Sequence, residues 1–369
     1  MPMENYIENH NDSQKSFKKV FSFIIKQGKT TRRKIQKFTN YSWGSVSSVV
    51  SLLLNKGHVI ETDSVKSGVG RGTTFIIPNG DKYVSIGVDI NSIGFSSSVI
   101  GIDGVVKYKN SFPYLGKTQE YVLDLLFKAI DDAIDFVEDK SEIVSIGVSC
   151  QGSVDLNHEI FKAFAFCDDL KDCNLKKIIE DKYGIYSFIE HDTNCLLEDY
   201  RFNHNKTASS ICVARVVSGI GFAICVNGQP LEEFGSIDFG RMIVQPNKEN
   251  LCGDLESYAS TVGIVKRAGV DDFSTIDNNR EKYRKVLDDA GFYLGVTLAN
   301  LNHIFALEEV AITGNVIGND STMLNTIINT AEKFSQNDKI KIQYISDLSA
   351  SYGAARLSLK NKIDSGEKL

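Results

Sequence analysis

The feature that most constrains the fold is a short amphipathic segment between Ser42 and Gly57. Its apolar residues recur at the spacing of one helical face, and they are Val46, Val49, Val50, Leu53 and Leu54. Ser42 is suited to cap the start of this helix, and Gly57 can adopt the left-handed conformation that ends it. Near its start, the opposite face carries one tryptophan and short polar side chains: Trp43, Ser45, Ser47, Ser48 and Ser51. The segment predicts a helix with one face in a core and the other free to enter a groove without burying charge.

The flanking segments predict a winged helix-turn-helix module. A helical stripe over residues 17–25, a short basic helix over 31–38 and a tight turn precede the amphipathic helix. Two extended runs follow at 58–62 and 73–77, separated by a glycine-rich basic stretch, which is the pattern of a hairpin wing. A small helical module with a solvated basic face would show a similar pattern, but stripe, turn, wing and charge together favour a double-stranded DNA operator as the partner. The expected DNA contacts are Arg32, Arg33, Lys34, Trp43, Ser45, Ser47, Ser48, Lys66 and Arg71.

Charge is distributed unevenly along the 369 residues. Residues 1–80 carry 12 Lys and Arg against 5 Asp and Glu, a net charge of +7, and the remainder carries 29 against 42, a net charge of −13. A basic head on an acidic body indicates a nucleic-acid-binding module joined to a part that does not bind nucleic acid. No stretch of about 18 consecutive apolar residues occurs and residues 1–16 are polar, so we expect a soluble, cytoplasmic protein without a membrane partner. The seven cysteines show no paired metal spacing, and we expect reduced core thiols.

Beyond a boundary near residues 78–81, strands and helices follow in two successive hairpin-plus-helix units. The first unit has expected strands at 83–89, 95–102, 105–109, 143–149 and 186–190, and helices at 119–138 and 194–202. The second has expected strands at 209–216, 221–226, 309–313 and 339–345, and helices at 321–334 and 349–360. Two units of similar order predict two similar lobes with a cleft between them. The expected domains are therefore 1–80, 81–200 and 201–369, with the C-terminal helix returning to the first lobe.

Five motifs of the body carry a family resemblance. They are 86–90 (IGVDI), 146–155 (IGVSCQGSVD), 190–194 (EHDTN), 218–221 (SGIG) and 255–260 (LESYAS). Together with the Gly-Arg-Gly of the wing, their order and spacing resemble the ROK family of repressors, open reading frames and sugar kinases, and its repressor branch in particular. The resemblance implies an actin-like (hexokinase-like, ribonuclease H-like) two-lobed α/β fold, a sugar in the cleft, and a homodimer or dimer of dimers.

The nucleotide motifs depart from the family pattern. The kinases hold the nucleotide phosphates with an Asp-x-Gly-Gly-Thr loop, whereas Asp89 is followed here by 90–93 (INSI), whose side chains crowd that approach. A second phosphate loop survives in part at 218–221, and the paired glycines near the adenosine are reduced to 313–315 (TGN). We therefore expect no catalytic residue and no nucleotide cofactor.

The zinc motif of the family is also lost. Its cysteine-rich loop has shrunk to 251–256 (LCGDLE), and Arg241 replaces the histidine that binds zinc and faces the sugar. One thiol without a histidine cannot fill four tetrahedral positions, so we expect no metal. Arg241 paired with Asp254 or Asp238 could hold this loop instead.

The sugar-binding positions are kept more fully. Asp192 matches the aspartate that accepts a proton from the sugar hydroxyl in the kinases, and Glu256 matches the glutamate that grips sugar hydroxyls. Asp238 replaces a glutamate, and His191 stands where an asparagine is usual. Each carboxylate could equally be a solvated or capping acid. The sugar-binding set implied by the resemblance is Asp192, Asn194, Asp238, Arg241, Glu256 and His191.

These features predict a sugar-responsive DNA-binding transcriptional regulator, in particular a repressor of carbohydrate-metabolism genes with a catalytically degenerate kinase-like effector domain. Its effector would be a small sugar or sugar derivative. Two alternatives stay open: an ATP-dependent sugar kinase with a DNA-binding head, and a regulator gated by a partner protein rather than by a sugar.

Overall fold

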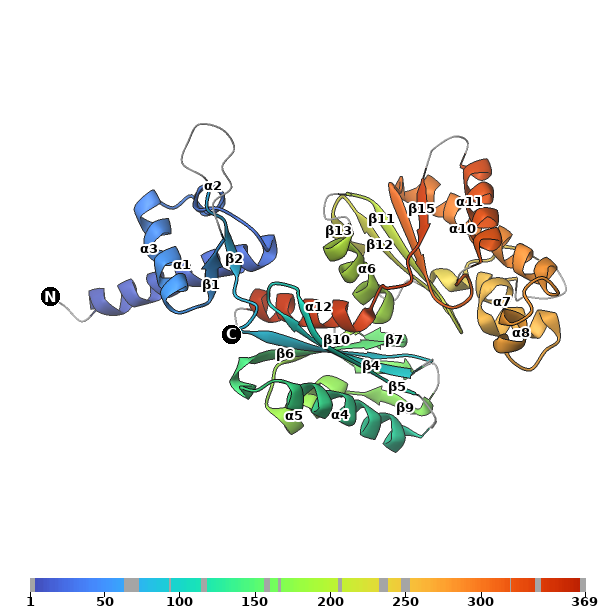
Figure 1. The fold of residues 1–369 in the computed structure, drawn as a ribbon, viewed down its shortest axis with the longest axis horizontal. Coiled ribbons are helices and arrows are strands. Elements are labelled where there is room, and N and C mark those ends of the chain that lie inside the picture. The colour runs from blue at the N-terminus through green and yellow to red at the C-terminus, as the bar shows by residue number, and fades with distance from the viewer. Residues whose placement is uncertain are drawn as a thin grey trace. The chain divides into compact units, whose positions relative to one another are not determined.

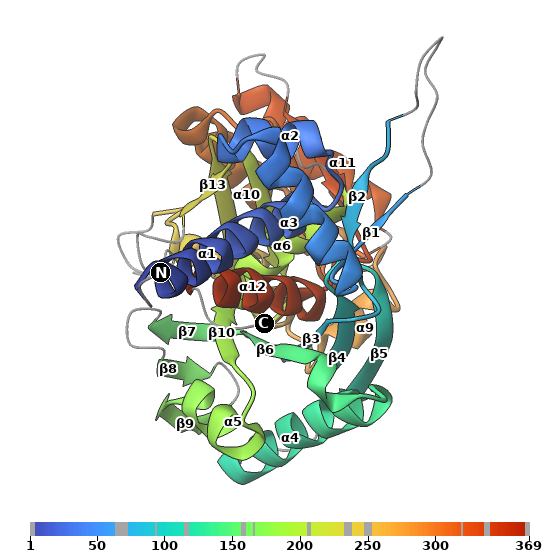
Figure 2. The ribbon, with the colours of Figure 1, turned by 90° about the vertical axis from the view of Figure 1, so that its left-hand side faces the viewer.

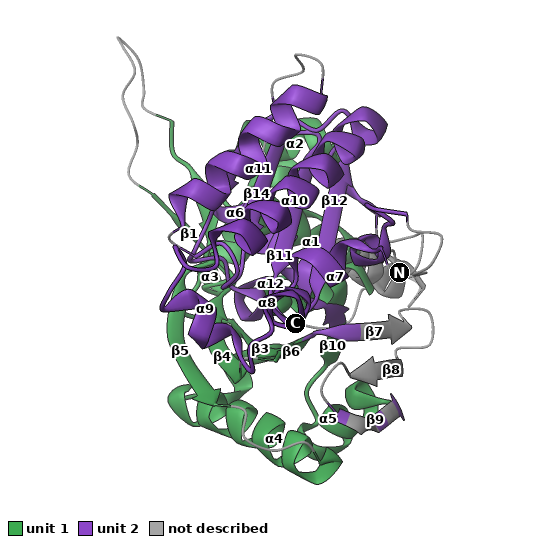
Figure 3. Ribbon diagram, turned by 90° about the vertical axis from the view of Figure 1, so that its right-hand side faces the viewer, with its two compact units in different colours: residues 1–149, 173–189, 354–369 green, residues 150–172, 190–353 purple. Residues whose placement is uncertain are grey.

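The computed structural model describes residues 4–62, 73–92, 94–113, 118–155, 160–164, 167–204, 208–231, 238–246, 253–318, 320–335 and 340–365. Contacts divide the chain into two compact units, coloured separately in Figure 3: unit 1 holds residues 1–149, 173–189 and 354–369, and unit 2 holds residues 150–172 and 190–353. Two of the points at which the chain passes from one unit to the other lie inside elements, namely β10 (Ser187–His191) and α12 (Ala350–Ser365). Residues 1–80 are grouped with the first lobe, and the division between the lobes falls after residue 189, whereas the sequence placed it after residue 200.

The N-terminal head of unit 1 consists of three helices and a two-stranded antiparallel sheet. Its elements are α1 (Glu4–Gln27), α2 (Arg32–Thr39), α3 (Trp43–Asn55), β1 (Val59–Glu61) and β2 (Ile76–Pro78). Ser42 caps α3 by accepting a hydrogen bond from the Ser45 N–H at 3.1 Å, and Gly57 follows the helix with a φ of +69°. The predicted helices, caps and extended runs are thereby confirmed. The stretch between β1 and β2, with Lys66 and Arg71, lies outside the described residues.

One hydrophobic core joins the head to the first lobe within unit 1. Its buried side chains include Val20, Ile24, Ile35, Val46, Val50 and Leu53 of the head and Ile102, Val144 and Leu359 of the lobe. At the junction the rings of His58 and Tyr83 stack with centroids 5.5 Å apart, and Lys26 Nζ lies 2.6 Å from Asp364 Oδ1. Head and first lobe therefore form one packed body rather than two parts on a free linker.

The first lobe is a five-stranded sheet with the order β10-β6-β3-β4-β5. Its other strands are β3 (Val84–Ile90), β4 (Gly94–Gly101), β5 (Val106–Pro113) and β6 (Ile143–Cys150). Helices α4 (Gln119–Phe136) and α5 (Leu175–Tyr183) cover one face, and α12 lies along the other (Figure 1, Figure 2). Gly147 on β6 permits this close approach, because a Cβ there would lie 2.0 Å from the Ala354 carbonyl oxygen. The 3-10 turn η1 (Lys140–Glu142) precedes β6.

Unit 2 is built on a second five-stranded sheet with the order β13-β12-β11-β14-β15. The strands are β11 (Ile211–Val216), β12 (Ile220–Val226), β13 (Gln229–Pro230), β14 (Glu309–Thr313) and β15 (Lys341–Tyr344). The two sheet faces are covered by α6 (Asp192–Asn203) on one side and by α10 (Arg284–Phe305) and α11 (Ser321–Phe334) on the other (Figure 1). The shorter elements are η3 (Phe239–Arg241), α7 (Leu255–Ala259), α8 (Thr261–Ala268) and α9 (Phe273–Asp277).

A three-stranded sheet in the middle of the chain was not predicted. It consists of β7 (Gly152–Asp155), β8 (Ile160–Phe164) and β9 (Cys167–Cys173). The strands and helices that the sequence predicted in the body agree with the structure to within a few residues at their ends, but α5, β13 and the long helix α10 were not predicted. The six cysteines among the described residues are buried, as predicted. None of the described helices is both long enough and apolar enough to span a membrane.

Candidate functional site

The six predicted sugar-binding residues all belong to unit 2. They form two groups: His191, Asp192 and Asn194 where β10 meets α6, and Asp238, Arg241 and Glu256 around η3 and the start of α7. Both groups border the start of β12, since Gly221 touches the first group and the Ile220 N–H bonds to the second. The fold thus brings the six residues to one end of the second sheet.

Asp192 is the first residue of α6 and is only 3% exposed. Its Oδ2 accepts a hydrogen bond from Arg215 Nη1 at 2.8 Å, and His191 Nδ1 lies 3.1 Å from its Oδ1. The N-terminus of α6 adds a field that favours a negative charge at this position. The Asp192 carboxylate is therefore compensated within the protein, by a cation that keeps its proton at any physiological pH.

Gly221 allows this arrangement. The register of β11 and β12 places Gly221 opposite Arg215, and a Cβ on Gly221 would lie 2.6 Å from Thr193 Cγ2. Any side chain at position 221 would push the first turn of α6 away from the sheet, and with it the carboxylate that Arg215 contacts.

Asn194 and Glu190 brace the same turn. Asn194 Nδ2 donates to Glu190 Oε1 at 3.1 Å, and the His191 N–H donates to the same oxygen at 2.6 Å. The His191 side chain in turn accepts from the Thr193 N–H and caps α6. Asn194 thus supports the loop through Glu190, a residue that is 2% exposed.

Glu256 is the centre of the second group. Its Oε1 accepts a hydrogen bond from the Ile220 N–H at 2.9 Å, and a Cβ on Gly219 would lie 2.8 Å from that oxygen. Burial raises the pKa of Glu256, and the charges of Asp238 and Asp254 raise it further, against the lowering effect of the Ile220 hydrogen bond and of Arg241. The protein contacts of the Glu256 carboxylate therefore only partly offset the cost of its burial.

Arg241 lies among three carboxylates around the loop that precedes α7. Its guanidinium lies 3.3 Å from Asp254 Oδ2 and 3.7 Å from Asp238 Oδ2 and Glu256 Oε2, so the predicted contact of Arg241 with Asp254 or Asp238 is confirmed. The Val244 N–H donates to the Gly253 carbonyl at 2.8 Å and closes the loop through the backbone. Among the described residues, no three His, Cys, Asp or Glu side chains are placed to hold a metal ion, and Cys252 lies outside them.

In unit 1, the Asp89 carboxylate is bonded to two neighbouring side chains. Asn91 Nδ2 donates to Asp89 Oδ2 at 2.7 Å, and Ser149 Oγ donates to Asp89 Oδ1 at 2.7 Å. The Asn91 amide, two residues after Asp89, thus binds one of the protein's own carboxylates.

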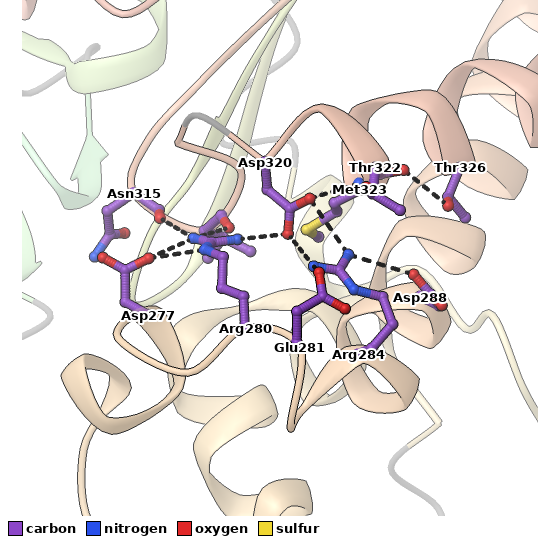
Figure 4. Close-up of polar contacts among 11 residues, drawn as sticks. Asp277, Arg280, Glu281, Arg284, Asp288, Asn315, Asp320, Thr322, Met323 and Thr326 are labelled. Atoms are coloured by element: carbon purple, nitrogen blue, oxygen red, sulfur yellow. Dashed lines mark hydrogen bonds and ion pairs between the residues drawn. The ribbon is translucent and has the colours of Figure 1, made fainter.

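Figure 4 shows an ion-pair network at the loop between β14 and α11 of unit 2. Asp320 caps α11 by accepting from the Met323 N–H at 3.0 Å, and Arg280 and Arg284 donate to its carboxylate at 3.1 and 2.7 Å. Arg280 also donates to the Val316 carbonyl at 3.0 Å. Burial alone would raise the pKa of Asp320, but the hydrogen bonds from Arg284, the Met323 N–H and Arg280 leave it below its usual value. The loop after β14, which contains Gly314 and Asn315, is thus tied to the segment that leads into α10.

In the head, the predicted DNA contacts differ in exposure. Trp43 is 51% exposed, and Arg33 and Lys34 also lie at the surface. Ser45 and Ser48 are exposed and Ser47 is partly buried. Arg32 is tied to the sheet instead, with its Nη1 2.5 Å from Glu61 Oε1.

A model of the ROK family matches residues 85–360, three quarters of the chain. The chain is a member of the ROK family. Among curated ROK relatives, the xylose repressor of Bacillus spizizenii is 24% identical over 328 residues, covering 82% of this chain and 83% of that protein. The DNA-binding transcriptional dual regulator NagC of Escherichia coli is 24% identical over 334 residues, covering 84% of this chain and 82% of that protein.

Solved structures of ROK proteins show the same fold. A ROK family transcriptional regulator described as a homolog of the E. coli MLC protein matches with a TM-score of 0.75 at 19% identity, covering 96% of this chain and 97% of that one. The ROK family glucokinase of Streptomyces griseus, in complex with glucose and AMPPNP, matches with a TM-score of 0.65 at 18% identity, covering 74% of this chain and 98% of that one. The body of this ROK protein therefore has the actin-like, hexokinase-type fold, as expected.

The sequence prediction missed three arginines that bind buried carboxylates of unit 2. Arg215, Arg280 and Arg284 were not among the candidates. A signal for Arg215 was present, because it is the one charged residue in the otherwise apolar run 211–216 (ICVARV). A charge inside a buried strand requires a partner. The other two arginines lie in a charged stretch, which offers no comparable contrast.

Proposed function

We propose that this ROK protein is a sugar-responsive DNA-binding transcriptional regulator, a repressor of carbohydrate-metabolism genes that acts in the cytoplasm. The observation that carries the proposal is the combination, in one chain, of a basic three-helix head with a ROK body whose Asp192 is already bound by Arg215. The relatives support it, because a xylose repressor and a transcriptional regulator match more than four fifths of the chain.

The head acts as a winged helix-turn-helix on an operator. In this proposal α3 enters the major groove, the hairpin of β1 and β2 is the wing, and Arg33 and Lys34 bind phosphates. Lys66 and Arg71 of the wing supply further phosphate or minor-groove contacts. A homodimer, or a dimer of dimers, would place two heads in successive major grooves about one helical turn apart or a multiple of it.

The effector is a small sugar or sugar derivative held at the six residues of unit 2. Glu256 and Asp238 offer acceptor oxygens to sugar hydroxyls and Arg241 offers donors, while Asp192, Asn194 and His191 form the braced turn beside them. A sugar acts on DNA binding only through its different affinity for the two states of the protein, and this sets the size of the response.

The protein is a receptor rather than an enzyme in this proposal, and it needs neither cofactor nor metal. A general base must have an oxygen within reach of the substrate proton, and Arg215 occupies Oδ2 of Asp192. The phosphate-loop Asp89 is occupied by Asn91 and Ser149, and Arg280 ties down the loop after β14. These three contacts favour the regulator over the kinase alternative.

The test is DNA binding followed by fluorescence anisotropy at fixed salt, with the chain's own upstream region as the probe. Pentoses, hexoses and their phosphates are then titrated in. We expect tight binding that one sugar shifts tenfold or more, a coupling of about 1.4 kcal/mol. Tight binding that no sugar moves would refute the sugar response and favour a partner protein. Sugar-dependent ADP release that is lost in Asp192→Asn would refute the receptor and establish the kinase.

A further inference from the structure

The exposed face of α3 has an unusual composition for a helix that enters DNA. Over residues 43–54 the exposed face consists of Trp43, Gly44, Ser45, Ser48, Ser51 and Leu52, and the buried face of Val46, Val50 and Leu53. These twelve residues include no Arg, Lys, Asn, Gln, Asp or Glu, and the one amide side chain of α3 is Asn55, its exposed last residue. The charged and amide side chains that most often recognise bases are therefore missing from the N-terminal part of α3, the part of a recognition helix that reaches base edges.

This composition limits which base edges α3 can recognise. In the major groove, guanine is selected by Arg or Lys, adenine by Asn or Gln, and cytosine by a carboxylate. Serine hydroxyls bond to either donors or acceptors and discriminate little. The remaining contact is apolar, and thymine is the base that presents an apolar group in that groove, its C5-methyl.

Trp43 is placed for such a contact. It is the first residue of α3, at the end of a recognition helix that reaches base edges, and half of its surface is exposed to solvent. Burying the exposed half of this indole ring against an apolar partner would be favourable in free energy, because it removes apolar surface from water. Leu52, at the other end of the same face, is 44% exposed.

Gly44 gives independent support for a close surface at this end of α3. A Cβ on Gly44 would meet only Ser42 Oγ, at the ordinary contact distance of 3.8 Å, so nothing in the protein requires glycine there. Glycine in a helix is unfavourable relative to alanine and is typical of positions where the backbone approaches a ligand closely. Contact between the base edges of the major groove and the first turn of α3 would explain both the absence of a side chain at Gly44 and the exposure of the Trp43 ring.

We propose that α3 recognises the operator through thymine C5-methyl groups packed against Trp43, so that its half-site is selected as A·T pairs in the correct orientation. This inference rests on the proposed DNA-binding function. Affinity comes from separate groups, because the exposed cations Arg33, Lys34 and Lys37 lie on α2. Trp43 is then a specificity residue, and its loss changes which duplex is preferred.

The experiment compares thymine with deoxyuridine in a duplex selected from a randomised pool by the full-length protein. Uracil keeps the base pair and lacks only the C5-methyl. We expect about a fourfold loss of affinity for each contacted methyl, the factor for one buried methyl group. Trp43→Ala should bind the thymine and uracil duplexes equally, whereas Ser51→Ala, on the same exposed face, should keep the difference. Trp43→Phe retains an apolar ring and should keep part of the difference in affinity between the two duplexes.

The outcomes separate the two proposals. Equal binding of both duplexes by the unaltered protein, or an unchanged uracil penalty in a Trp43→Ala protein with normal helical circular dichroism, would overturn the methyl contact alone. Failure of the selection to enrich any sequence over competitor DNA would overturn the DNA-binding regulator itself.

Discussion

Asp320→Ala should destabilise unit 2, because one carboxylate both caps α11 and compensates two arginines (Figure 4). Its side chain is 4% exposed, while those of Arg280 and Arg284 are 16% and 19% exposed. Removing one partner of a buried ion pair costs about 3–5 kcal/mol. Because both guanidinium groups retain some contact with water, we expect the lower end, about 3 kcal/mol, with the lost helix cap included.

The assay is urea unfolding followed by circular dichroism at neutral pH. Fluorescence of Trp43, the single tryptophan, reports on the head separately. The matched control is Asp277→Asn, since Asp277 contacts the same Arg280 at 2.7 Å but is 55% exposed and should contribute less than about 1 kcal/mol. Equal effects of the two substitutions, or a loss below about 1 kcal/mol for Asp320→Ala, would refute the assignment of Asp320 as the buried centre of the network.

The same carboxylate predicts a pH dependence of known sign. Since the folded state lowers the pKa of Asp320, its stabilising effect is complete above the unfolded-state pKa, about 3.9, and is lost as the pH falls through the folded value. In Asp320→Asn, the free energy of unfolding of unit 2 should therefore fall less steeply as the pH decreases into the acid range. An unchanged pH dependence in this variant would contradict the assignment.

Three further predictions concern the two binding surfaces. Gly221→Ala should abolish the sugar-induced thermal shift and destabilise the protein by about 1–3 kcal/mol, because its Cβ overlaps Thr193; a retained shift would contradict the proposed packing at Asp192. The raised pKa of Glu256 predicts that sugar affinity falls on acidification already above the usual glutamate value of about 4.3, and calorimetry should find this dependence absent in Glu256→Gln. Arg33→Gln should weaken operator binding equally for all sequences and reduce the slope of log K against log salt by about 0.9, whereas an altered sequence preference would contradict a phosphate contact.

The elements that sequence reasoning predicted best are those set by local rules. The stripe and caps of α3 depend only on residues within the helix and at its two ends, Ser42 and Gly57. β9 escaped prediction because its sequence, CDDLKDC, lacks the β-branched and aromatic residues and the alternation that mark a strand. β9 is a strand because it pairs with β8 in the three-stranded sheet.

The candidate site was predicted in part for the same reason. Asp192 and Glu256 could be located from motif order, and the structure places both at one end of the second sheet. Arg215 is brought to Asp192 by the register of β11 with β12 and by the approach of α6 over Gly221, which are contacts between distant segments. The unit boundaries likewise fall inside continuous elements, β10 and α12, where no change of composition marks them.

Two buried carboxylates and one loop of the body share one property. Asp89 is bonded to Asn91 and Ser149, Asp192 to Arg215, and the loop after β14 to Arg280. A buried polar group that already has a protein partner gains little from a ligand, because the ligand must first replace that partner.

Glu256 differs from these groups because its close partner is a backbone N–H, that of Ile220, and not a charged side chain. Its nearest cation is 3.7 Å away, and burial, to which two neighbouring carboxylates add, raises its pKa. Hydrogen-bond donors on a ligand would offset the cost of that burial without displacing a close ion pair. Among the six residues of the proposed sugar site, Glu256 is therefore the one at which a bound sugar should gain most.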